Sequence, residues 1–92
     1  MKALSPEQLL IIADAFCDKH NVQVTSFSAL VAAAAVPGAR FEGIAVFTEV
    51  TEAARALEEA ICRLEPLDHA NEDFAAYVRA VYKKWALHPL TD

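Results

Sequence analysis

The sequence predicts an all-α fold, a compact bundle of about four helices within one small domain, residues 1–92. Three observations support this prediction. Apolar side chains recur at helical spacing along four segments, which end near Lys19, Val36, Leu64 and Leu87. Helix-ending residues follow each segment. Neither an internal repeat nor a low-complexity linker interrupts the pattern.

The first helix has a clear start. Ser5 is a good N-cap, Pro6 suits the first helical position, and Gln8 completes a capping box with Ser5. The helix should run to about Lys19 and end at Asn21, a residue that tolerates a left-handed backbone. Its expected core-facing stripe is Leu9, Ile12, Ala13, Phe16 and Cys17.

A short extended piece, 22–24, leads to the second helix. Thr25 or Ser26 can cap this helix, which we expect to span Phe27 to Val36. Because it is rich in alanine and apolar throughout, we expect it to be largely buried. The pair Pro37-Gly38 ends it.

The connector from Arg40 to Phe47 is a second candidate for extended structure. Gly43 allows a turn, and Ile44–Phe47 could form a strand. One short strand is not stable without a partner. We therefore expect a loop with a possible β-bridge, which could form a short extended flap at 41–47.

Two longer helices complete the bundle. The third should be capped by Thr48 or Thr51 and end at Leu64, because Pro66 disfavours helix at the preceding residue. The fourth should open within 68–71 and run to about Leu87, before His88 and Pro89. The expected core residues of these two helices are Val50, Ala53, Ala54, Leu57, Ile61, Leu64, Phe74, Val78, Val81 and Trp85.

Composition excludes several classes of function. The net charge is −5 and no basic run exists, so we expect no nucleic-acid partner. No apolar stretch is long enough to cross a membrane. The first residues lack the apolar region of a signal peptide, which indicates a cytoplasmic protein. Cys17 and Cys62 have no metal or redox motif around them, and we expect both to be buried free thiols.

The apolar content, 55%, is high for a chain with so much surface per residue. Such a composition favours a homodimer or another protein partner that covers apolar surface.

The order of these segments resembles the Fic/Doc family, whose death-on-curing branch supplies toxins of bacterial toxin–antitoxin modules. The likeness covers nearly the whole chain. It is carried by Leu4–Leu10, Ala35-Val36-Pro37, Phe41, Gly43, Phe47, Glu52–Leu57 and the stretch Glu65–Asp73.

The last stretch aligns with the family's active-site signature, His-x-Phe-x-Asp/Glu-Gly-Asn-Lys/Gly-Arg. The resemblance implies a histidine as general base, an acid that holds magnesium, a Gly-Asn turn that binds phosphate, and an arginine that clamps it. The family reaction transfers a nucleotide or phosphoryl group onto a protein hydroxyl. The signature positions in this chain are Glu65, Leu67, His69, Ala70, Asn71, Glu72 and Asp73.

Most of these positions carry the wrong chemistry. Glu65 replaces the histidine, His69 replaces the magnesium-holding acid, and Glu72 with Asp73 replaces the basic end. Only Asn71 matches a functional position, while Leu67 and Ala70 are conservative replacements. We therefore expect a bacterial pseudoenzyme that binds no cofactor or metal and acts through protein binding or self-association. The alternative is an active transferase in which Glu65 acts as the base.

Three other interpretations of this region remain open. Glu65, Asp68, His69 and Asp73 could form a zinc or manganese site, and Glu65 with His69 could be an acid–base pair. The carboxylates could also simply stabilise a helix N-terminus.

The end of the chain offers a second register. His88–Asp92 resembles the first half of the same signature, which would make the protein a fragment of a longer enzyme.

Overall fold

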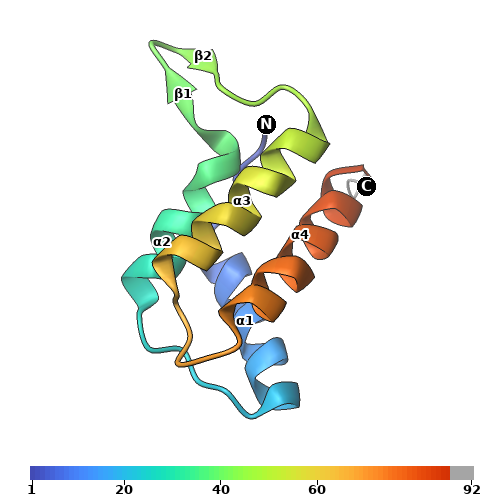
Figure 1. The fold of residues 1–92 in the computed structure, drawn as a ribbon. Helices are drawn as coiled ribbons and strands as arrows, with labels where there is room; N and C mark the ends of the chain where they lie inside the picture. The colour runs from blue at the N-terminus through green and yellow to red at the C-terminus, as the bar shows by residue number, and fades with distance from the viewer. Residues whose placement is uncertain (88–92) are drawn as a thin grey trace.

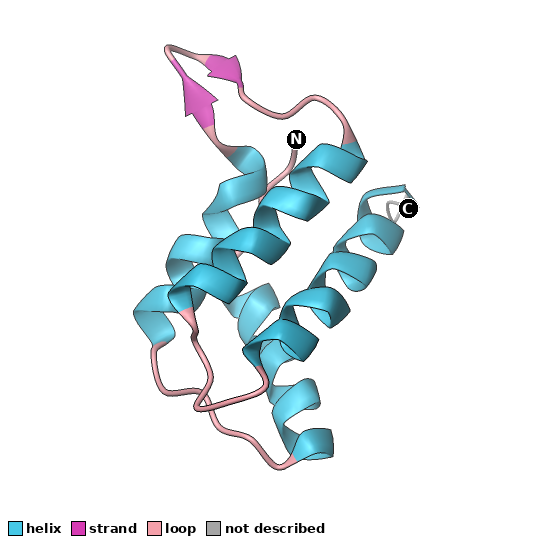
Figure 2. Cartoon of the chain, in the orientation of Figure 1, coloured by secondary structure: helices cyan, strands magenta, loops and turns pink. Residues whose placement is uncertain are grey.

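Four helices form most of the part that the structure describes, residues 1–87 of a computed structural model (Figures 1 and 2). The prediction of an all-α bundle is confirmed. The elements are α1 (Pro6–His20), α2 (Phe27–Ala35), the 3₁₀ turn η1 (Val36–Gly38), β1 (Arg40–Phe41), β2 (Ile44–Ala45), α3 (Val50–Leu64) and α4 (Asn71–Leu87). The predictions for His88, Pro89 and the second signature register lie outside the described residues.

The ends of α1 follow from its local sequence. The Ser5 hydroxyl accepts a hydrogen bond from the Gln8 N–H at 3.0 Å, and the Ser5 N–H donates to Gln8 Oε1 at 2.8 Å. Asn21 takes a left-handed backbone with φ 56° and ends the helix. Both predicted signals are confirmed, since the capping box and the left-handed stop need only neighbouring residues.

The expectation that α2 is largely buried was wrong. Ser26 caps the helix, and its inner face, which includes Leu30 and Ala33, is buried. However, Phe27 is 51% exposed and Val31 is 38% exposed. Only one side of α2 packs against α1 and α3, and a domain of this size has no further layer to cover the other side.

The connector forms a two-stranded antiparallel hairpin, in which Arg40 pairs with Ala45 and Phe41 with Ile44. The pairing goes further than the possible β-bridge that we expected, because Arg40–Phe41 supplies a partner strand. The turn is made by Glu42 and Gly43, both with positive φ. The hairpin projects from the bundle (Figure 2), so the predicted flap exists as a paired structure.

The start of α3 also differs from the prediction, because neither threonine caps it. Glu49 is the N-cap, and its side chain makes no capping hydrogen bond. The helix begins at Val50, which packs against the core. Glu65 ends the helix in a left-handed conformation, and Pro66 follows as expected.

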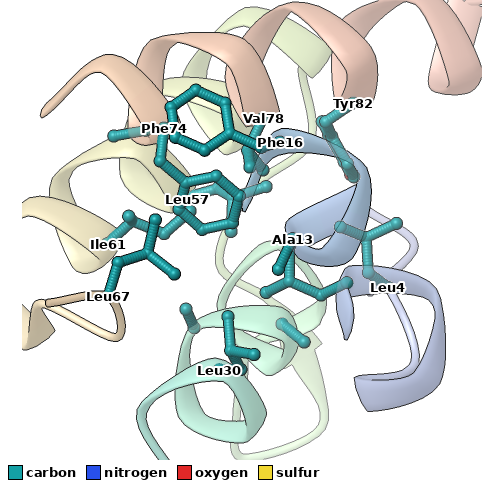
Figure 3. Packing of buried hydrophobic residues seen from close by; sticks show 14 of the residues in the cluster. Leu4, Ala13, Phe16, Leu30, Leu57, Ile61, Leu67, Phe74, Val78 and Tyr82 are labelled. Carbon is teal, nitrogen blue, oxygen red and sulfur yellow. The ribbon is translucent and has the colours of Figure 1, made fainter. Parts of the chain in front are cut away.

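The core lies between the four helices, with α3 and α4 packed against each other along their length (Figures 1 and 3). Phe74, Val78, Leu57 and Ile61 meet there, as predicted. Two expectations were wrong: Val81 is half-buried without packing against the core cluster, and Leu64 is exposed. Trp85 is half-buried but packs against the core, as expected. Besides Phe74 and Val78, α4 also buries Ala75 and Tyr82 fully, which the prediction did not include.

Within residues 1–87, no helix is both long enough and apolar enough to cross a membrane.

Candidate functional site

The loop between α3 and α4 begins and ends with a left-handed residue. Glu65 has φ 50° and its N–H still donates to the carbonyl of Ile61, which closes α3. Ala70 has φ 60°, and its carbonyl accepts the first helical hydrogen bond of α4, from the Phe74 N–H at 3.0 Å. The loop therefore turns sharply twice within six residues and points the N-terminus of α4 into the space beside it.

Hydrogen bonds tie this loop to the extended segment before α2. The carbonyl of Pro66 accepts from the N–H groups of Thr25, at 2.8 Å, and Ser26, at 3.1 Å. The Asp68 N–H donates to the Gln23 carbonyl, and the Gln23 N–H donates to Asp68 Oδ1 at 3.2 Å. Val24 and Leu67 form a β-bridge between the two segments. Bonds to Pro66 and Asp68, one of them on the Asp68 carboxylate, thereby hold the loop to a distant part of the chain.

Asn71 uses its whole amide group to hold the same loop. Its Oδ1 accepts from the Leu67 N–H at 2.9 Å, and its Nδ2 donates to the Leu67 carbonyl at 3.0 Å. The Leu67 side chain in turn is buried near Ile61 (Figure 3). Asn71 therefore holds the backbone of the loop through both ends of its amide group.

An open hollow of about 570 Å³ lies beside this loop and the first turn of α4. All seven signature positions line it, so the structure brings together the residues that the sequence analysis singled out. The hollow is lined by Thr25, Cys62, Glu65, Leu67, Asp68, His69, Ala70, Asn71, Glu72 and Asp73.

The hollow is acidic. Four carboxylates line it, from Glu65, Asp68, Glu72 and Asp73, and none of its lining residues among the described part of the chain is lysine or arginine. The N-terminus of α4 carries the partial positive charge of the helix dipole, and the acids of its first turn already complement that charge. The arrangement can attract a cationic group but repels phosphate.

His69 contacts Asp68 rather than Glu65. Its Nδ1 lies 2.9 Å from Asp68 Oδ1, and both side chains are exposed. The N–H of Gln23, and after it the nearby His69, hold the pKa of Asp68 below the ordinary value for aspartate. The structure thus favours an ionised Asp68 with a role in the loop over an acid–base pair between Glu65 and His69.

Metal-ligating side chains do not converge in the hollow. Over residues 1–87, no group of three or more His, Cys, Asp and Glu side chains is arranged to hold a metal ion. The ligand set considered from the sequence, Glu65, Asp68, His69 and Asp73, does not form a site of that kind.

The two cysteines are free, but the expectation that both are buried was wrong. Cys17 is half-buried, whereas Cys62 is exposed and lies at the hollow. Partial burial is the main cause that raises the pKa of the Cys62 thiol, and Glu58, Glu72 and Glu59 raise it further. A thiol with a raised pKa is a poor nucleophile at neutral pH, so the hollow does not activate Cys62.

Sequence reasoning did not place Thr25, Cys62 or the Gln23 backbone in this region. Thr25 and Gln23 reach the loop only through the pairing of segments more than forty residues apart. No local pattern signals such a pairing. Cys62 lies one helical turn before Glu65, and that spacing could have placed it beside the loop.

Comparison of the chain with models of protein families, with curated proteins and with solved structures gave no match.

Proposed function

We propose that this chain is a catalytically degenerate Fic/Doc-like protein that acts by binding protein, either a partner or a second copy of itself. The observation that carries the proposal is the acidic hollow. It lies where the family signature would place phosphate, and Glu72 and Asp73 stand at the positions of the family's basic residues.

The backbone at the hollow supports the resemblance to this family. Ala70 stands at the glycine position of the signature and has the left-handed φ that glycine adopts without strain. Asn71 begins α4 at the matching place in the chain. A turn of this shape before a helix N-terminus is suited to bind phosphate. Here it keeps that shape while its side chains carry the opposite charge.

The charges argue against the transferase alternative. Two like charges about 4 Å apart cost about 1 kcal/mol even in bulk water, and more near a protein surface. A triphosphate brings several negative charges to a hollow that already has four carboxylates. Glu65 could accept a proton, but a base without a phosphate site cannot carry out phosphoryl or nucleotidyl transfer.

Exposed apolar side chains support a role in binding protein. Three of them, Phe41, Ile44 and Val46, lie on or beside the projecting hairpin, and Ile11 lies on α1. Large apolar side chains gathered at the surface mark protein contact sites in small domains.

Thermal unfolding with and without ATP and Mg²⁺ tests the loss of phosphate binding. We expect no increase in melting temperature. A ligand present at about 100 times its dissociation constant would add about 2.7 kcal/mol to the free energy of unfolding, which is easily detected.

The double variant Glu72→Lys/Asp73→Arg serves as the matched control, because it restores the charge of the family signature without changing Ala70 or Asn71. We expect it to gain an ATP-dependent increase in melting temperature. A clear shift in the wild type, or transfer of nucleotide label to lysate proteins that Glu65→Ala abolishes, would support the transferase instead.

A further inference from the structure

An apolar groove of about 210 Å³ lies between α1 and α4, away from the acidic hollow. It is open to solvent, and apart from Gln8 its lining is apolar or aromatic: Leu4, Ile11, Ile12, Val81, Tyr82 and Trp85. Tyr82 forms its floor and is fully buried, whereas Trp85 and Val81 are half-buried. The groove thus exposes apolar surface that α1 and α4 do not cover for each other.

Ile11 stands at the edge of this groove and is 68% exposed. A large aliphatic side chain in this position is a protruding knob next to an apolar hole. Both features lie on the same face of the molecule. In a two-fold symmetric dimer the same patch faces itself, so the knob of each copy can meet the groove of the other.

Charged side chains flank the groove, and their signs differ between its two edges. Glu7 and Asp14 are exposed on α1 one turn to either side of Ile11. On the other edge, the Lys2 ammonium lies 5.1 Å from the centre of the Trp85 ring, and Lys84 is exposed one turn beyond Val81. The edge of the groove beside Ile11 is therefore acidic, and the opposite edge, beside Trp85 and Val81, is basic.

We propose that this face is the interface of a homodimer, in which Ile11 of each copy packs into the α1–α4 groove of the other. The acidic edge of one α1 then faces the lysines of the second copy, twice by symmetry. A second copy fits this face because one patch supplies the knob, the hole and both signs of charge. The proposal rests on the proposed function in that it names the partner of a binding protein.

The size of the face sets the expected strength of the dimer. α1 has 15 residues, and a rise of 1.5 Å per residue makes it roughly 22 Å long. Two helices side by side, each about 10 Å wide, give the face a width of roughly 20 Å at most. The buried surface would be at most roughly 900 Å² in total, at the low end for a specific interface. We therefore expect a weak, reversible dimer that forms at micromolar to millimolar concentration and weakens as salt is added.

Sedimentation of the full chain over this concentration range, from dilute to near-millimolar, tests the proposal. The wild type should pass from monomer to dimer, and Ile11→Glu should remain monomeric throughout. The matched control is Ile44→Glu on the hairpin, because Ile44 is similarly exposed at 73%. We expect this control to dimerise like the wild type. Circular dichroism should show that both variants keep the helical content of the wild type.

A charge exchange adds a test that does not depend on the apolar contact. Glu7→Lys and Lys84→Glu should each weaken the dimer several-fold, and the double variant should recover most of the wild-type affinity. Such recovery is expected only if the two edges face each other.

Three outcomes would overturn the proposal: a wild type that stays monomeric, a dimer that survives Ile11→Glu, or a dimer lost in Ile44→Glu instead. A monomeric wild type would assign the groove to a different occupant. None of these results depends on nucleotide binding, so failure here is distinct from failure of the proposed loss of the phosphate site.

Discussion

At Ala70 the backbone adopts φ 60°, a conformation in which the Cβ of any residue other than glycine crowds its own carbonyl oxygen. Asn21 shares this conformation at the end of α1, but asparagine tolerates it well. Alanine has no polar group with which to compensate. The loop therefore carries local strain at the residue just before α4, and the hydrogen bonds of Asn71 and Pro66 hold it there.

Ala70→Gly should relieve this strain. The left-handed conformation costs alanine about 1–2 kcal/mol, and glycine gives back about 0.4–1 kcal/mol through the greater entropy of the unfolded chain. We expect a net gain of roughly 0.5–1 kcal/mol in the free energy of unfolding, measured by urea denaturation. The matched control, Ala76→Gly at an exposed position within α4, should instead lose about 0.5–1 kcal/mol. Destabilisation by both substitutions would contradict the left-handed assignment.

At the level of elements, the loop 65–70 and the segment 22–26 behave as one unit. Asp68 joins them twice, through its N–H to the Gln23 carbonyl and through its carboxylate to the Gln23 N–H. The carboxylate is exposed, so its contribution is modest, but it depends on ionisation. The pH dependence of stability therefore reports on this junction.

The sign of that dependence follows from the pKa of Asp68, which the Gln23 N–H and then His69 lower in the folded state. A lowered pKa means that ionised Asp68 stabilises the fold at pH above the ordinary aspartate value. This contribution is lost as the pH falls through the lower, folded-state pKa. Asp68→Asn should thus lower the melting temperature at neutral pH, with a difference from wild type that shrinks in acid.

Melting temperatures measured from neutral to acidic pH check this expectation. Glu59→Gln, at an exposed position within α3, controls for the loss of one negative charge. A deficit in Asp68→Asn that stays constant across the whole range would contradict a role for the ionised carboxylate.

Elements whose signals are local were predictable from the sequence. The capping box of Ser5 and Gln8, the stop at Asn21 and the break at Pro66 each need only a few neighbouring residues. The first strand of the hairpin was missed because Arg40–Phe41 is too short to show any alternation, and its pairing with Ile44–Ala45 decides its structure. The start of α3 was missed because its N-cap, Glu49, makes no side-chain capping bond, so no local signal marks this end.

At the level of the whole molecule, predictability depended on how far apart in sequence the contacting residues lie. The signature positions from Glu65 to Asp73 are contiguous, so a correct reading of the turn was enough to bring them to one hollow. Thr25 and the Gln23 backbone join them from across the fold. In the same way, Tyr82 is buried because the first residues of the chain cover it, which no periodicity within α4 could indicate.

Tyr82 connects the two ends of the described chain. Its ring is fully buried among the helices (Figure 3), and its hydroxyl donates a 2.8 Å hydrogen bond to the carbonyl of Lys2. The ring contributes packing and the hydroxyl contributes a single tertiary bond. Separate substitutions can therefore tell how much of the stability comes from each.

Tyr82→Phe keeps the ring and removes the bond, so it should cost about 0.5–1.5 kcal/mol. Tyr82→Ala removes the ring as well, and by analogy with other aromatic truncations it should cost about 3–5 kcal/mol. Denaturation at low protein concentration, where any dimer is dissociated, measures both. Tyr77→Phe is the control on the same helix, and because Tyr77 is 43% exposed we expect almost no effect. If Tyr82→Phe were as neutral as this control, the hydrogen bond to the Lys2 carbonyl would add nothing measurable to the free energy of unfolding. Packing of the ring would then account for the whole contribution of Tyr82.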